Sequence, residues 1–181
     1  MNRASTASIL NYLKYNLLGG LGVFPRRGLG VSALVFLIYV LLVIPTGLGS
    51  DVIKPRLAEW TAFLYMPFTL LIFPSLLEEA FFRGLLIPRN TGDGGKGRIV
   101  FFTLLSSLLF TVWHPLNALT INPGAAGIFL DPWFLFITFL LGLTCSLGYI
   151  YTRSLWAPVL MHWLTVLVWV LFLGGHNLLL R

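Results

Sequence analysis

Three charged side chains interrupt a long apolar part of the sequence, in the segment PSLLEEAFFRG at residues 74–84. On a helix, Glu79 and Arg83 are four residues apart with the acid first, which is the favoured geometry for an ion pair. Glu78 lies five residues before Arg83 and points away from it. We therefore predict an ion pair between Glu79 and Arg83, and an unpaired carboxylate at Glu78 that is a candidate general base.

Two histidines, His114 and His162, interrupt apolar stretches further along the chain. A lone histidine in a membrane helix can be a hydrogen-bonded packing residue and nothing more. Two histidines together with an unpaired glutamate, on three different helices, favour a shared polar site. Amide hydrolysis needs a base for the attacking water and a group that stabilises the anion, and Glu78, His114 and His162 can supply both.

Carboxylates and histidines are also zinc ligands, so a zinc site formed by Glu78, His114 and His162 is an alternative. The sequence has no HExxH pair, which would place two zinc ligands on one helix. This absence favours a reaction without a metal or another cofactor, which is also what the family resemblance given below implies.

Apolar helices must hold these polar residues. The chain is 57% hydrophobic and only 10% charged, which lies outside the range of soluble domains. Apolar runs without charges cover residues 31–44, 60–77, 99–113, 133–152 and 155–173. We predict an all-α, polytopic membrane helical bundle with about five transmembrane spans, formed as a single domain over residues 1–181. Residues 9–18 are predicted to form an interfacial helix at the N-terminus.

The second span has two possible ends. If it ends at Leu77, the two glutamates only mark its wet end. However, the sequence stays apolar after the charges until Pro88, so the helix can run on and place Glu78 inside the bundle. We favour the longer helix.

The basic residues indicate the orientation in the membrane. They concentrate in the N-terminal segment and in alternate connections, at Lys14, Arg26, Arg27, Arg89, Lys96, Arg98 and Arg153. This distribution predicts a cytoplasmic N-terminus and an external C-terminus, and the net charge of +6 favours contact with anionic headgroups of the lipid bilayer. The basic residues form no continuous stripe interleaved with exposed aromatic residues, which argues against nucleic-acid binding.

The motif residues occur in a fixed order: Glu78-Glu79-x-x-x-Arg83, then Phe110-x-x-x-His114, then His162 after Ser154-Leu155-Trp156-Ala157-Pro158. This combination resembles the CAAX prenyl protease and bacteriocin-processing family (CPBP, or ABI) of glutamic intramembrane endopeptidases. The resemblance is strongest over residues 68–168.

This resemblance implies a role for each motif residue. Glu78 would activate the attacking water, His114 would help to position it, and His162 would help to stabilise the tetrahedral oxyanion. Glu79 and Arg83 are assigned to support Glu78. The implied substrate is a membrane-associated peptide or protein, cleaved in a CAAX-type C-terminal tail or in a leader peptide, and the expected location is a bacterial plasma membrane.

The chain departs from the family pattern at one position. The third motif usually continues HxxxN or HxxxD, but here Val166 stands four residues after His162 and cannot donate a hydrogen bond. Loss of one oxyanion donor costs about 100- to 1,000-fold in rate. Thr165 and Asn117 are candidate substitutes.

Two other classes of function stay open. Val166 is compatible with a non-catalytic membrane adaptor or a bacteriocin-immunity-type protein. A small transporter could use Glu78 and the histidines as a proton relay, although no inverted repeat is visible.

Two geometric questions follow from the spacing. Counted at about 1.5 Å per residue from one membrane side, His114 lies about 20 Å deep and His162 about 10 Å deep, so they meet only if spans tilt or the fifth span starts inside the bundle. The segment 117–131, which contains Pro123 and two glycines, is either a cover over the site or a simple connector.

Overall fold

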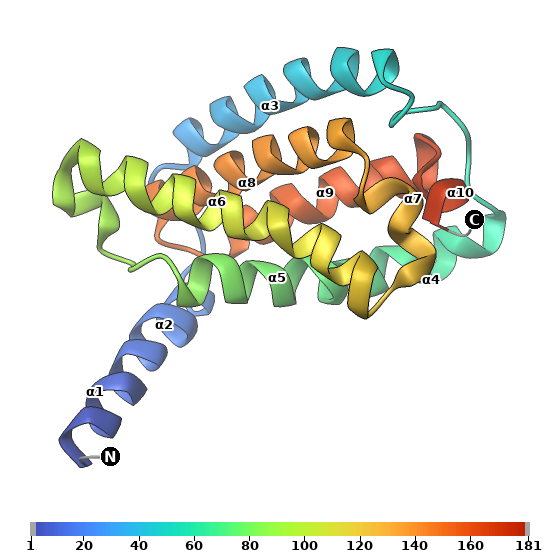
Figure 1. The fold of residues 1–181 in the computed structure, drawn as a ribbon. Coiled ribbons are helices and arrows are strands. Elements are labelled where there is room, and N and C mark those ends of the chain that lie inside the picture. Colours follow the sequence, from blue (N-terminus) through green and yellow to red (C-terminus); the bar gives the residue numbers. More distant parts are fainter. Residues whose placement is uncertain (1–2, 180–181) are drawn as a thin grey trace.

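The apolar segments form helices that pack into one bundle (Figure 1) in the computed structural model, which describes residues 3–179. Four helical segments are long and apolar enough to cross a membrane, namely Leu29–Gly49, Trp60–Leu85, Thr91–Thr120 and Pro132–Thr152. A fifth apolar helix, Trp156–Phe172, is shorter. The structure is 82% helical, and no strand occurs in residues 3–179. The prediction of an all-α polytopic membrane bundle is confirmed.

The helical elements follow one another with short connections. In chain order they are α1 (Arg3–Leu13), η1 (Lys14–Leu18), α2 (Gly19–Leu21), α3 (Leu29–Gly49), α4 (Trp60–Leu70), η2 (Leu71–Leu76), α5 (Leu77–Glu79), η3 (Ala80–Leu85), η4 (Thr91–Gly94), α6 (Gly95–Thr120), η5 (Pro123–Ala125), α7 (Ala126–Phe129), α8 (Pro132–Thr152), α9 (Trp156–Phe172) and α10 (Gly175–Leu179).

Helix α8 is the centre of the bundle and packs against α3, α6 and α9. Small residues allow its close approach to α6. A Cβ atom on Gly142 would lie 3.0 Å from the Cβ atom of Ser107, and the hydroxyl oxygens of Ser107 and Ser146 are 3.5 Å apart. Without a hydrophobic driving force between helices in lipid, such close backbone packing is a main source of helix association.

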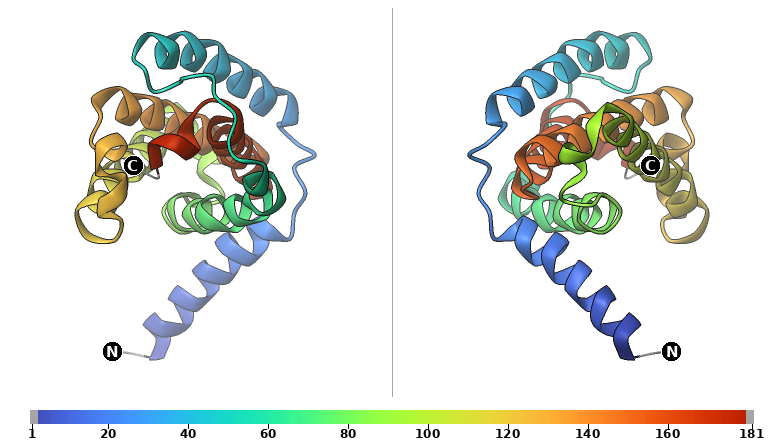
Figure 2. Two further views of the ribbon diagram at one scale, coloured as in Figure 1. Left: turned by 90° about the vertical axis from the view of Figure 1, so that its right-hand side faces the viewer. Right: turned by 90° about the vertical axis from the view of Figure 1, so that its left-hand side faces the viewer.

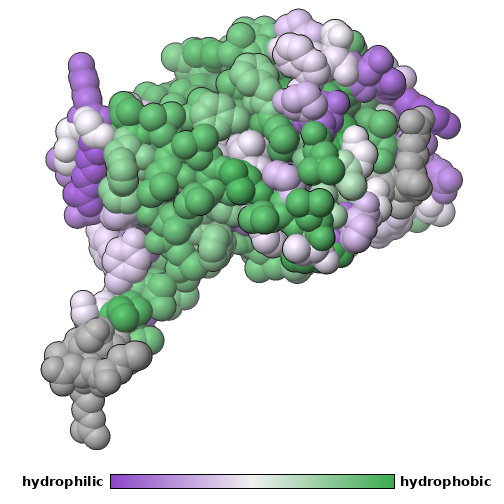
Figure 3. All heavy atoms as spheres, in the orientation of Figure 1, coloured by the Kyte–Doolittle hydropathy of each residue, from purple (hydrophilic) through white to green (hydrophobic). Residues whose placement is uncertain are grey.

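The two ends of the bundle are polar and its middle is apolar. Figure 3 shows an apolar band of side chains with hydrophilic residues gathered at both ends. At one end, Arg89 Nε donates to the carbonyl oxygen of Arg153 at 3.0 Å, and Arg153 forms an ion pair with Asp93. The connections after the second and the fourth spans, which were predicted to lie on the same side of the membrane, are therefore in contact. That this side is the cytoplasmic one stays a prediction.

The N-terminal helix is longer than the predicted residues 9–18, because α1, η1 and α2 continue one another from Arg3 to Leu21. This N-terminal helix projects away from the bundle (Figures 1 and 2). Its C-terminal end contacts the start of α9: the backbone N–H of Leu155 donates to Gly20 O at 2.9 Å, and Trp156 Nε1 donates to Leu21 O at 2.9 Å.

These contacts answer the question of depth. Ser154 and Leu155 are fully buried, so α9 begins inside the bundle and not at its surface. Backbone outside a regular helix is tolerated there because the N-terminal segment satisfies its polar groups. The condition under which the two histidines can meet, a fifth span that starts inside the bundle, is therefore fulfilled.

Candidate active site

The helix that carries the glutamates bends once and then continues. Phe73 has φ −119° and ψ 118°, an extended conformation that suits a residue before proline, here Pro74. Beyond this kink the helix runs through η2, α5 and η3 to Leu85. The alternative in which the span ends at Leu77 is therefore wrong. Both glutamates lie in α5, a single turn between two π-helical segments, and π-helical turns are frequent at functional sites.

Glu79 forms the predicted ion pair, and it also contacts a second partner. Glu79 Oε1 lies 3.0 Å from Arg83 Nη1 and 2.9 Å from His162 Nδ1. Arg83 Nη2 donates to Gly142 O at 3.0 Å, and all three side chains are buried. A carboxylate paired with arginine only accepts hydrogen bonds, so Nδ1 of His162 carries a proton and Nε2 is the ring nitrogen left for a ligand.

The sequence assigned Glu79 and Arg83 to support of Glu78, and that role stays a prediction. Glu79 and Glu78 are both acceptors, and the structure gives no hydrogen bond between them. Glu79 and Arg83 instead contact His162, and the guanidinium carbon of Arg83 lies 4.5 Å from the centre of the Phe110 ring. The direct contacts of the pair therefore orient the second histidine.

Glu78 is partly buried at the edge of a cavity. Its Oε1 accepts a hydrogen bond from Trp113 Nε1 at 3.0 Å, and its Oε2 is buried without a partner among the described residues. Trp113 is not among the site residues predicted from the sequence, although it directly precedes His114 in the second motif. Because the two partners are 35 residues apart, only the docking of α6 beside α5 brings them together.

His114 is held by its own helix and by aromatic rings. Its Nδ1 lies 3.0 Å from Phe110 O, and a carbonyl oxygen only accepts, so Nδ1 is again the protonated nitrogen. The ring centres of Phe110, Phe129 and Phe134 lie 5.1, 5.2 and 5.6 Å from that of His114. These contacts fix the ring and leave Nε2 as its free acceptor.

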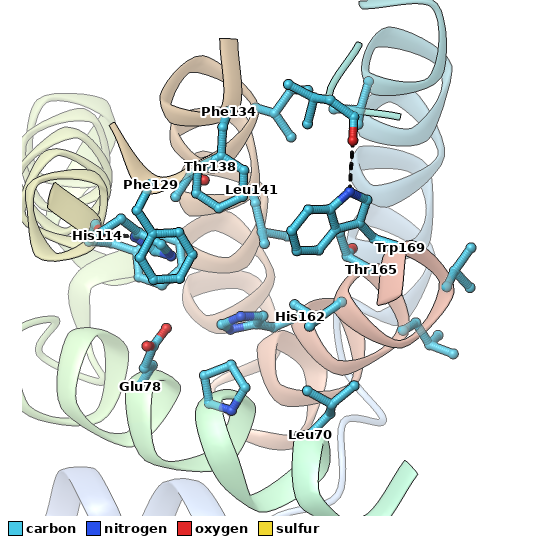
Figure 4. Close-up of a pocket in the computed structure, with 18 of the residues that line it drawn as sticks. Leu70, Glu78, His114, Phe129, Phe134, Thr138, Leu141, His162, Thr165 and Trp169 are labelled. Atoms are coloured by element: carbon cyan, nitrogen blue, oxygen red, sulfur yellow. Dashed lines mark hydrogen bonds between the residues drawn. The ribbon is translucent and has the colours of Figure 1, made fainter. Parts of the chain in front are cut away.

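The three predicted catalytic residues converge. Glu78, His114 and His162 line one cavity of about 870 Å³ and reach it from α5, α6 and α9 (Figure 4). The Phe110 ring joins the two histidines, because its centre is 5.1 Å from His114 and 5.5 Å from His162. The remaining wall is mainly apolar, with Phe36, Tyr39, Leu70, Phe73, Leu141 and Trp169 among its residues.

The two candidate oxyanion donors also line the cavity, but they differ in availability. The hydroxyl of Thr165 donates to Met161 O at 2.8 Å, so its only hydrogen is committed to its own helix. Asn117 would donate to an oxyanion through Nδ2, which makes no hydrogen bond within residues 3–179; its Oδ1, which is buried without a partner, can only accept. Val166 faces the cavity as well and contributes no polar atom. Asn117 is the more available of the two donors.

The segment between α6 and α8 covers the site. It forms η5 and α7, and Phe129 of α7 lines the cavity beside His114. The Phe129 ring stacks on Phe134 with a centre distance of 5.3 Å. Of the two readings of this segment, a cover and a simple connector, the contacts agree with the cover.

Within the described part of the chain, no three side chains of His, Cys, Asp or Glu are arranged to hold a metal ion. Glu78, His114 and His162 thus share a cavity without forming a ligand set as they stand. Each histidine uses Nδ1 for a hydrogen bond to the protein, so only Nε2 of each ring could coordinate a metal ion.

Comparison with protein families supplies the identity. The family model Rce1-like, described as type II CAAX prenyl endopeptidase Rce1-like, matches residues 59–168, which is more than half of the chain. The chain belongs to this family. The suspected CPBP membership is thereby confirmed, and all residues of the three motifs lie within the matched range. Neither the curated proteins nor the solved structures gave a match.

Family membership fixes the general activity. The protein is an integral membrane hydrolase, a CAAX-type intramembrane protease that acts on membrane-associated substrates. The chemistry of the cut and the substrate itself are separate questions.

Proposed function

We propose that the protein is a glutamic intramembrane endopeptidase that cleaves a prenylated CAAX-type C-terminal tail with a water activated by Glu78. The observation that carries the proposal is the convergence of Glu78, His114 and His162 on one cavity from three helices. The family description supports the class of substrate. The cavity is of the size that small ligands occupy, and its mainly apolar wall suits a lipidated, uncharged segment.

The first step needs a base and a second acceptor for water. Glu78 Oε2 takes a proton from the water, whose oxygen then attacks the scissile carbonyl carbon. His114 donates through Nδ1 to Phe110 O, so its Nε2 accepts the other hydrogen of the water. Because Glu78 and His114 each accept one hydrogen of the water, a lone pair on its oxygen is directed toward the carbonyl carbon.

The second requirement is stabilisation of the oxyanion. His162 holds Glu79 through Nδ1, and its imidazolium form can donate from Nε2 to the oxyanion. Glu79 fixes the orientation of this ring, and Arg83 fixes the carboxylate of Glu79 in place. Protonated Glu78 then returns its proton to the leaving amine, the C–N bond breaks, and the carboxylate is restored.

One observation favours a second function. Val166 stands where the family usually places a hydrogen-bond donor, and it faces the cavity. A site without this donor would suit a non-catalytic adaptor that binds a membrane protein but does not cut it.

The test uses purified protein in lipid vesicles and a farnesylated, internally quenched peptide with a CAAX terminus. Glu78→Gln keeps the shape of the side chain and removes the base, so we expect kcat to fall about 100- to 10,000-fold. Glu59→Gln is the matched control, because Glu59 is exposed at the start of α4 and should leave cleavage unchanged. Full activity of Glu78→Gln would overturn the mechanism, and absence of cleavage by the wild type would favour the adaptor.

A further inference from the structure

The carboxylate of Glu78 has one hydrogen-bond donor among the described residues, the indole N–H of Trp113. The neighbouring carboxylate of Glu79 is committed to Arg83 and His162. None of the three sequence motifs assigns a role to Trp113. The orientation of the proposed base therefore depends on a residue that the motifs leave out.

The two oxygens of the Glu78 carboxylate have different surroundings. Trp113 Nε1 lies 3.0 Å from Oε1 of Glu78, while Oε2 keeps no protein partner in residues 3–179. An indole N–H can only donate, so it binds the carboxylate without competing for the protons of a water. A hydrogen bond to an ionised acceptor is also about twice as strong as a neutral one.

The position of the indole is itself fixed. Trp113 packs against the core cluster that contains Phe82 and Phe110, and it is only partly exposed. Adjacent residues on a helix point about 100° apart, so Trp113 reaches across to α5 while His114 turns back to Phe110 O. One turn of α6 therefore orients both the proposed base and the acceptor for the water.

We propose that Trp113 is a positioning residue that holds Oε1 of Glu78 and thereby presents Oε2 to the catalytic water. This inference rests on the proposed function of Glu78. Loss of the N–H frees the carboxylate to rotate, so it weakens the chemical step and leaves substrate binding largely intact.

The test separates the N–H from the bulk of the ring. Trp113→Phe keeps an aromatic ring and removes the donor, and we expect kcat to fall about 10- to 100-fold with KM within about twofold of the wild type. Trp163→Phe is the matched control: Trp163 Nε1 donates to Pro67 O at 2.8 Å, outside the cavity, so the same change should leave kcat within about threefold.

A second variant covers the case in which the smaller ring disturbs packing. Replacement of Trp113 by benzothienylalanine puts sulfur in place of the N–H in a ring of the same shape, and the same loss of kcat is expected. Wild-type kcat in the benzothienylalanine variant, whatever the result for Trp113→Phe, or a change in KM alone, would overturn the role of Trp113. If Glu78→Gln in the same assay is fully active, the proposed function fails instead, so the two failures are distinguishable.

Discussion

At the scale of single residues, both histidines of the site use Nδ1 to donate to the protein and keep Nε2 for the reaction, but their partners differ. His114 donates to a neutral carbonyl oxygen, whereas His162 donates to the carboxylate of Glu79. In the proposed mechanism His114 is therefore the acceptor for the water, and His162 is the oxyanion donor because the adjacent carboxylate can balance the charge of a ring that donates from both nitrogens.

The missing family donor leads to a prediction about Asn117. If Asn117 stabilises the oxyanion in place of a residue at 166, then Asn117→Ala should lower kcat about 100-fold, and adding Val166→Asn should restore much of it. Cleavage rates of the single and double variants check this. Asn122→Ala is the control, because Asn122 is an exposed asparagine on the rim of the same cavity. Wild-type kcat in Asn117→Ala would show that Asn117 is not the donor.

The metal-free mechanism makes a separate prediction. Cleavage should stay within about twofold after treatment with a zinc chelator and dialysis, since no step of the mechanism needs a Lewis acid. Activity assays before and after treatment, with Zn²⁺ added back, check it. A loss that Zn²⁺ reverses would support zinc binding by Glu78, His114 and His162.

Contacts between these residues can be predicted from the sequence where the partners are close along the chain. Glu79 and Arg83 are four apart on one helix, so their pairing follows from helix geometry alone. The bonds from Trp113 to Glu78 and from Glu79 to His162 join different helices, and their sequence separations are 35 and 83. Such contacts depend on how the helices dock, which no local pattern encodes.

At the scale of helices, the buried charges connect four elements of the bundle. Glu79 on α5 bonds His162 on α9, and Arg83 on η3 bonds the backbone of Gly142 on α8. Removal of one partner from a buried ion pair leaves an uncompensated charge, which is more costly than the loss of an exposed pair. The network therefore contributes to stability as well as to the orientation of His162.

This network predicts a large loss of stability for Arg83→Met. The free energy of unfolding in detergent should fall by about 3 to 5 kcal/mol, because Glu79 stays buried without its arginine. Arg153→Met is the control: its ion pair with Asp93 is exposed, so the change should cost about 1 kcal/mol or less. Equal stability of the two variants would contradict the structural role of Arg83.

The sequence predicts which segments form membrane helices better than it predicts where each helix begins and ends. Apolar run length identifies the spans, and Pro88 correctly marks where the second span cannot continue. From the sequence, a buried start of α9 follows only as a condition for His114 and His162 to meet. It depends on carbonyl groups of Gly20 and Leu21, which lie more than a hundred residues earlier in the chain.

At the scale of the whole molecule, hydropathy alone fixes the class of fold, because the bilayer requires nearly uncharged spans whose backbone groups are satisfied internally. The orientation in the membrane rests on the distribution of Lys and Arg. We propose a cytoplasmic N-terminus and an external C-terminus.

Reporter fusions test this orientation. A protein that fluoresces only in the cytoplasm should be bright at the N-terminus and dark at the C-terminus, and a phosphatase that folds only outside the cytoplasm should give the reverse. Fusions in the connection that precedes α6, at Asp93, serve as an internal control, because this connection should behave like the N-terminus. A bright C-terminal fusion would contradict the topology.

The most direct test of the central claim compares protein termini in membrane fractions of cells that lack this gene, complemented with the wild type or with Glu78→Gln at equal expression. It requires no prior choice of substrate. We predict new C-termini that appear only with the wild type, which would identify the substrate and place Glu78 in the reaction. Identical termini in both samples, with the cellular phenotype restored by both, would contradict glutamate-dependent proteolysis.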